Sequence, residues 1–122
     1  MIVRTGEKLM VVEKRLFDGD TRRLFLGQVE ALEGGVARVT GTTWGWDPEE
    51  ETYVCRDEIR TRIVSLTSGQ ALIYVLPPAT NLRTMDVQRE GQTLIARDGE
   101  GFKMNVAFGD LRRKGPPPAK KK

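Results

Sequence analysis

The sequence of 122 residues predicts an all-β fold, a small and strongly bent antiparallel barrel with an additional C-terminal hairpin. Three observations predict it: glycine-containing turn dipeptides recur along the chain, short apolar or alternating segments lie between them, and helix-period patterns are scarce. The dipeptides are Asp18-Gly19, Gly34-Gly35, Ser68-Gly69, Glu90-Gly91 and Asp98-Gly99.

Three strands are expected in the N-terminal half, at Leu9–Phe17, Arg23–Leu32 and Val36–Trp44. The second alternates, which places Phe25, Gly27, Val29 and Ala31 on one face and Gln28 and Glu30 on the other. We expect Gly27 at the tightest bend, because a strand curving around a narrow barrel has no room there for a side chain.

The next segment, Gly45–Glu58, is acidic and is expected to form either a long loop or a splayed hairpin arm. Trp44 and Trp46 alternate at its start, so both project from one face of a strand. They form either a stacking or docking surface, or a barrel cap and a contact between subunits.

Further strands are expected at Ile63–Leu66 and at Leu72–Leu76, and Pro77-Pro78 ends the second because proline cannot donate to a ladder. Residues 79–83 are expected to form a single helical turn. A last hairpin is expected from Leu94-Ile95 and Phe102–Phe108, closed by Asp98-Gly99.

The charge is divided between a domain and a tail. The chain carries 20 basic and 17 acidic residues, and six of the basic residues lie in the last eleven positions, which contain no acid. Residues 1–111 therefore have a net charge of −3 and are expected to form one domain, whereas the proline- and lysine-rich residues 112–122 are expected to be a disordered basic tail.

The composition argues against catalysis. The chain has no histidine, which removes the commonest general base and metal ligand. Its lone cysteine, Cys55, is expected to pack in a strand, and the carboxylates of Asp47–Glu51 lack the spacing of a calcium loop and are expected to be solvated. We expect no catalytic residue, no bound metal and no cofactor.

The longest apolar run, Ala71–Leu76, is too short to span a membrane, and the start of the chain lacks an uninterrupted apolar signal region. The expected location is therefore the cytoplasm, with no membrane contact.

The order of these features resembles the Sm-like family of small β-barrels, which assemble into rings. The resemblance covers Leu9–Pro78. Residues 25–32 (Phe-x-Gly-x-Val-x-x-Leu) are similar to the core of the first Sm motif, with Val36 and Val39 continuing it, and residues 63–77 are similar to the second, a strand, a tight turn with glycine, a strand and a proline. The resemblance implies a homo-oligomeric ring of about five to seven chains.

The departures from the family pattern lie at its RNA-binding positions. RNA-binding members carry an aspartate and an asparagine in the first motif and an Arg-Gly in the second, where this chain has Glu33, Ala37 and Ser68-Gly69. The base-reading amide and the guanidinium are therefore replaced. We expect any RNA binding by the domain to be weak and non-specific, with the tail cations that begin at Arg112, Arg113 and Lys114 contacting phosphates.

Two functions follow from the sequence. The first is a non-catalytic, ring-forming Sm-like scaffold or adaptor with weak RNA binding. The second is a small protein-interaction module of a multiprotein or phage assembly, without nucleic-acid binding, whose partner meets the Trp44–Tyr53 loop.

Overall fold

The computed structural model describes residues 2–13, 23–56, 58–69, 71–91 and 93–106. These residues form one antiparallel sheet with a short 3-10 helix, so the predicted all-β class is confirmed. The strands are β1 (Lys8–Glu13), β2 (Leu24–Glu33), β3 (Val36–Asp47), β4 (Thr52–Cys55), β5 (Arg60–Ser65), β6 (Ala71–Leu76), β7 (Asp86–Glu90), β8 (Thr93–Arg97) and β9 (Lys103–Val106), and the helix is η1 (Leu82–Thr84).

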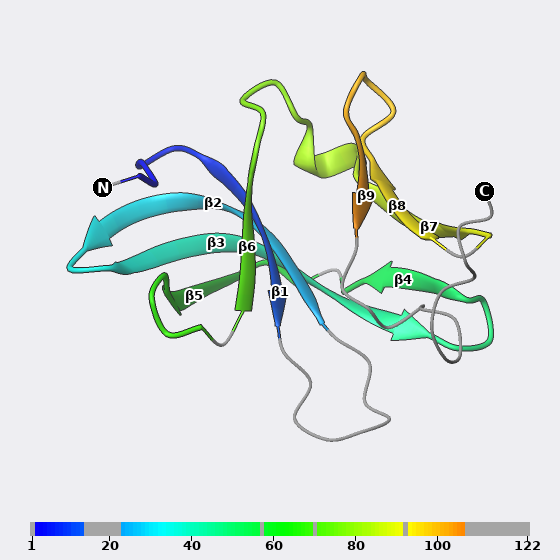
Figure 1. The fold of residues 1–122 in the computed structure, drawn as a ribbon, viewed down its shortest axis with the longest axis horizontal. Helices are drawn as coiled ribbons and strands as arrows, with labels where there is room; N and C mark the ends of the chain where they lie inside the picture. Colours follow the sequence, from blue (N-terminus) through cyan, green and yellow to red (C-terminus); the bar gives the residue numbers. More distant parts are fainter. Residues whose placement is uncertain (1, 14–22, 57, 70, 92, 107–122) are drawn as a thin grey trace, which may run out of the picture.

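Strand β3 belongs to two parts of the sheet, because its two halves pair with different strands. Its order is β6-β1-β2-β3-β4-β7-β8-β9, and β5 also pairs with β3. Residues 36–41 of β3 pair with β5, whereas residues 44–47 pair with β4. Strands β6, β1, β2, β3 and β5 therefore curl into a half-barrel, while β4 leads to the C-terminal sheet of β7, β8 and β9 (Figure 1).

Strand β1 and residues 24–27 of β2 are buried on both faces, which explains why β1 is apolar from Leu9 to Val12. Leu9 and Val11 of β1 lie in one apolar cluster, and Met10 and Val12 lie in another. The first, which we call the barrel cluster, contains Val3, Leu9, Val11, Phe25, Val29, Ala37 and Val39, with half-buried residues of β5 and β6 packed against it. The second, the sandwich cluster, joins the half-barrel to the C-terminal sheet and contains Met10, Val12, Leu24, Leu26, Trp44, Tyr53, Leu76, Met85, Val87, Leu94, Ala96 and Val106.

The predicted close approach at Gly27 is confirmed, and it involves a second glycine. Gly27 pairs directly with Gly41 across β2 and β3. A Cβ atom at Gly27 would lie 2.6 Å from the Thr40 carbonyl oxygen, and one at Gly41 would lie 1.9 Å from the Leu26 carbonyl oxygen. The two paired strands can approach this closely only because neither residue has a side chain.

One facing assignment is wrong. The register of β2 against β3 shifts between Val29 and Ala31, so Glu30 is an extra residue in the ladder. This bulge reverses the alternation beyond it: Ala31 is exposed, and Leu32 packs against the barrel cluster. A strict period of two cannot reveal such an insertion.

The turn predictions hold where the structure describes them. Gly34, Gly35, Gly69, Gly91 and Gly99 all have positive φ angles. The predicted turn at Asp18-Gly19, with the end of the first strand at Phe17, lies outside the described residues, as do Phe108 and the whole predicted tail. Strand β6 ends at Leu76, immediately before Pro77-Pro78, as predicted.

Of the two expectations for Gly45–Glu58, the hairpin arm is correct. Strand β3 continues to Asp47, and β4 returns from Thr52 to Cys55. In the turn, Asp47 Oδ1 accepts hydrogen bonds from the backbone N–H groups of Glu49 and Glu50. Glu51 follows with a φ of 55°, a left-handed conformation that favours glycine.

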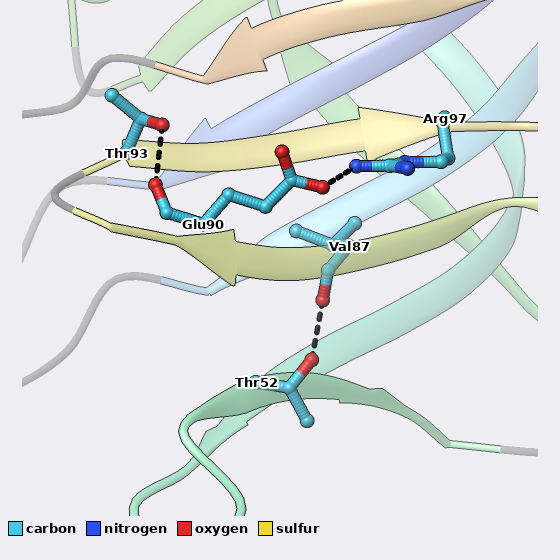
Figure 2. Close-up of polar contacts among 5 residues, drawn as sticks. All are labelled: Thr52, Val87, Glu90, Thr93 and Arg97. Atoms are coloured by element: carbon cyan, nitrogen blue, oxygen red, sulfur yellow. Dashed lines mark hydrogen bonds and ion pairs between the residues drawn. The ribbon is translucent and has the colours of Figure 1, made fainter.

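The C-terminal extension is larger than one hairpin, because β7 adds a third strand before β8 and β9. The predicted helical turn at residues 79–83 is found slightly later, as η1. Figure 2 shows one contact that attaches the extension: the Thr52 hydroxyl of β4 donates to the Val87 carbonyl oxygen of β7 at 2.5 Å. Within the extension, Glu90 of β7 and Arg97 of β8 form an ion pair (Figure 2). No helix within the described residues is long and apolar enough to cross a membrane.

Candidate functional site: turns and sheet edges of the half-barrel

The two turns that carry the predicted RNA-binding positions lie together at one end of the half-barrel. The β2–β3 turn and the β5–β6 turn meet because the Leu66 backbone N–H donates to the Gly35 carbonyl oxygen at 2.9 Å. Val36 pairs with Ser65 next to this bond. The structure therefore brings together two segments that are about thirty residues apart in the sequence. We call this end of the barrel, formed by residues 33–36 and 66–69, the two-turn end.

The predicted site residues differ in accessibility. Glu33, Ser68 and Gly69 are exposed at the two-turn end, whereas Ala37 is fully buried in the barrel cluster. A ligand at this end would meet the Glu33 carboxylate and the Ser68 hydroxyl, and the Ala37 methyl group would lie beneath them in the core. Arg112, Arg113 and Lys114 lie outside the described residues.

The electrostatics of the two-turn end do not favour phosphate. Among residues 33–36 and 66–69, Glu33 is the only charged residue. A carboxylate repels a nucleic-acid backbone, whose binding to proteins depends on neutralising cations. Chemically, the end offers a carboxylate, hydroxyl groups and main-chain groups of exposed turns.

Strands β5 and β6 flank the two-turn end, and each has one hydrogen-bonded neighbour within the described sheet. Among the described residues, each therefore has one edge with no strand paired to it, which we call an open edge. Large apolar side chains are exposed on both: Ile63 of β5 is 64% exposed, Leu72 of β6 is 46% exposed, and Val75 of β6 is similar. Open edges with exposed apolar side chains are surfaces on which another strand can pair.

The two edges differ in charge. Strand β6 has no charged residue, whereas β5 contains Arg60 and Arg62. Arg62 points inward, with its guanidinium carbon 4.9 Å from the centre of the Phe25 ring, and it forms an ion pair with Glu13 of β1. An inward-pointing charge on an edge strand discourages pairing with other chains. Here Glu13 neutralises that charge within the chain.

The aromatic hairpin of β3 and β4 is mostly part of the core. Trp44 and Trp46 lie on the same face, as predicted, because both pack in or against the sandwich cluster. Trp44 and Tyr53 are buried, and Trp46 meets Tyr53 edge to face at 5.3 Å between ring centroids. Half-buried Trp46 is therefore the aromatic group of this hairpin that a partner could reach. Cys55 is also half-buried against the sandwich cluster.

Asp98 has a role that the sequence did not suggest beyond its place in a turn. Its carboxylate is buried and accepts hydrogen bonds from three backbone N–H groups: Asn81 to Oδ2 at 2.9 Å, and Glu100 and Phe102 to Oδ1 at 2.8 and 2.9 Å. The Asn81 N–H contributes most to holding the pKa of Asp98 below its ordinary value. Asp98 thus ties the segment before η1 to the β8–β9 turn, and its lone pairs are occupied by the backbone.

Within the ranges that the structure describes, no group of three histidine, cysteine, aspartate or glutamate side chains is arranged to hold a metal ion. Comparison of the chain with models of protein families, with curated proteins and with solved structures finds no match in any of the three. The fold and the surface define a small all-β protein built on a strongly curled antiparallel half-barrel, whose outer strands β5 and β6 each have an open edge in the described part of the chain.

Proposed function

We propose that this protein is a non-catalytic scaffold or adaptor whose chains assemble into a closed ring through the open edges of β5 and β6. The observation that carries the proposal is that β5 and β6 each have one edge unpaired within the described sheet, with Ile63, Leu72 and Val75 exposed on them. Because the two edges are different surfaces, pairing of β5 in one copy with β6 in the next is a head-to-tail contact, which closes into a ring when the rotation fits. The resemblance to the Sm-like family supports the same assembly, with about five to seven chains.

The test is the mass of the assembly, measured by light scattering behind a sizing column. The informative variant is Leu72→Lys, which places a charge on the uncharged edge strand β6, and its matched control is Val54→Lys. Val54 is 44% exposed, close to the 46% of Leu72, but it lies on β4, which has a neighbour on each side. We expect Leu72→Lys to dissociate the ring and Val54→Lys to leave it intact. A stable monomer of the parent protein at micromolar concentration would refute the assembly.

We also propose weak, sequence-independent RNA binding that depends on the six cations of the tail rather than on the two-turn end. Two observations support binding by the tail rather than by the folded domain. Residues 1–111 have a net charge of −3, and the single charge at the two-turn end is the negative charge of Glu33. Replacing the six cations with glutamine should abolish measurable binding at physiological salt and leave the oligomer intact. For the parent, the affinity should fall with a log–log salt slope of about −0.7 per phosphate contacted on a single strand. Tight, uridine-selective binding that survives the replacement would place the site on the barrel instead.

The alternative function, a protein-interaction module that uses the Trp44–Tyr53 hairpin, is supported by half-buried Trp46 and exposed Val54 on β4. The same measurement of mass separates the two functions, because a partner-binding module needs no self-assembly. The lone Cys55 agrees with a reducing compartment, and we propose a cytoplasmic location for either function.

A further inference from the structure

An open cleft of about 680 Å³ lies where the N-terminal segment meets the end of β6. Residues 4–8 line one part of it, Gln28 of β2 contributes an amide, and residues 75–78 supply the apolar part. Its volume is within the range of small ligand sites and also suits two or three side chains of another protein.

The cleft combines two cations with an apolar lining. Lys8 Nζ is fixed by hydrogen bonds to the carbonyl oxygens of Pro78 at 2.8 Å and Thr80 at 2.5 Å. The Arg4 guanidinium makes no ion pair with the described residues, although Glu7 Oε1 accepts a hydrogen bond from the Arg4 backbone N–H. The lining also includes the Glu7 carboxylate, so the cleft carries a net charge of +1. It fits a segment that presents one carboxylate beside one apolar side chain.

The chain itself contains such a segment, immediately before β5. The Glu58 side chain is 71% exposed, although it also pairs with Arg60 at 2.7 Å, and Ile59 is 72% exposed. The described part of the chain leaves most of the Ile59 side chain exposed, and its burial against another surface would be favourable.

The direction of strand pairing connects this segment to the cleft. Every strand pair in the described sheet is antiparallel. If β5 of one copy pairs antiparallel with β6 of the next, the beginning of β5 lies beside the end of β6. The beginning of β5 follows Ile59, and the end of β6 at Leu76 lines the cleft.

We propose that the cleft is the receptor for Glu58 and Ile59 of the neighbouring copy, with Glu58 facing Arg4 and Lys8 and Ile59 packing on Val75, Pro77 and Pro78. This inference rests on the ring assembly proposed above and adds to it a specific contact outside the strand ladder. It also assigns a second role to the residues before β1, which cover the barrel cluster through Val3 and hydrogen-bond to Gln28 and Val29 of β2.

The test is a charge exchange, with the association of the full-length chain measured by analytical ultracentrifugation. Arg4→Glu and Glu58→Arg should each weaken association by about three- to tenfold, which is the expected effect of reversing one charge in a partly exposed pair. The double variant should restore association to within about twofold of the parent. Arg83→Glu is the matched control, because Arg83 is exposed on η1 and the charge changes by the same amount.

The apolar half of the contact has its own test. Ile59→Ser should weaken association by about tenfold, since the variant loses the burial of most of one aliphatic side chain. Val54→Ser, on β4, should have little effect. If the parent is a monomer, both the ring and this contact are refuted. If the parent assembles but Arg4→Glu behaves like Arg83→Glu and the double variant restores nothing, the contact is refuted while the edge assembly stands.

Discussion

The paired strands β2 and β3 approach so closely at Gly41 that there is no room for a single methyl group. In Gly41→Ala the new Cβ would lie 1.9 Å from the Leu26 carbonyl oxygen and 2.4 Å from the Gly27 Cα atom. Ordinary contact begins at 3.4 Å, so the strands would have to separate by about 1.5 Å. The atoms met are backbone atoms of a paired strand, which cannot turn aside as a flexible side chain can.

We expect Gly41→Ala to lower the free energy of unfolding by about 3 kcal/mol or more, which combines the 1–3 kcal/mol of overpacking with the weakening of one or two ladder hydrogen bonds of about 1 kcal/mol each. Gly27→Ala, at 2.6 Å from the Thr40 carbonyl oxygen, needs about half that displacement and should cost about 1–3 kcal/mol, and Gly27→Val should be at the upper end. Urea unfolding followed by the fluorescence of Trp44 and Trp46 measures these values.

The control lies four residues further along the same strand. A Cβ at Gly45 would meet the Arg56 guanidinium at 3.4 Å, and that group is the far end of a flexible side chain. Gly45→Ala should therefore be neutral, or stabilising by up to about 0.5–1 kcal/mol because alanine loses less backbone entropy on folding. Equal stability of Gly41→Ala and Gly45→Ala would show that the close approach of the strands does not exist in solution.

Two further predictions concern local conformation and pH. Glu51→Gly should raise the free energy of unfolding by about 0.5 kcal/mol, because glycine adopts the left-handed backbone conformation at this position without strain. This gain outweighs the entropy that glycine adds to the unfolded chain and the loss of the exposed ion pair between Glu51 and Arg89 at 3.6 Å. Glu50→Gly, which relieves no such conformation, should be destabilising, and the same sign for both variants would contradict the reasoning. The pKa of Asp98 is lowered in the folded chain from its ordinary value of 3.8. The stability that the Asp98 carboxylate contributes is therefore complete at pH values above this ordinary pKa, and it is lost as the pH falls through the pKa of the folded chain. Between pH 7 and pH 3 the urea midpoint of the parent should therefore fall more than that of Asp98→Asn, and identical pH profiles would count against this account of Asp98.

The half-barrel was predictable because its signals are local. Tight turns require glycines at positive φ, so Gly34 and Gly35 identify a turn in the sequence itself. A close approach of two strands requires a residue without a side chain, so Gly27 identifies a bend. The bulge at Glu30 was not predictable, because it depends on the register of β2 against β3 and leaves the composition of the strand unchanged. Gly41 was missed for a similar reason, since its role appears only when its partner across the ladder is known.

The surface was less predictable than the core. The two-turn end could be expected from the motif order, but the burial of Ala37 follows from the inward face of β3, which the sequence alone does not orient. The open edges and the cleft arise from which strands pair and where the N-terminal segment lies. Arg62 illustrates the limit: whether an arginine on an edge strand is solvated or turned inward onto Phe25 beside Glu13 depends on three strands far apart in the sequence.

Strands β1 and β2 contribute side chains to both apolar clusters, which predicts that the two parts of the fold unfold together. Because these strands supply side chains to both the barrel cluster and the sandwich cluster, the half-barrel and the C-terminal sheet should unfold in one cooperative transition. Val87→Ala removes buried methyl groups from β7 only, at a cost of about 2 kcal/mol. Residues 36–41 of β3 pair with β5 in the half-barrel. If the two parts are coupled, the slowest amide hydrogen exchange over these residues should accelerate by about thirtyfold, which is the factor that corresponds to 2 kcal/mol. Exchange over residues 36–41 that stays at the parent rate while the tryptophan fluorescence transition shifts would show that the half-barrel is stable without the C-terminal sheet.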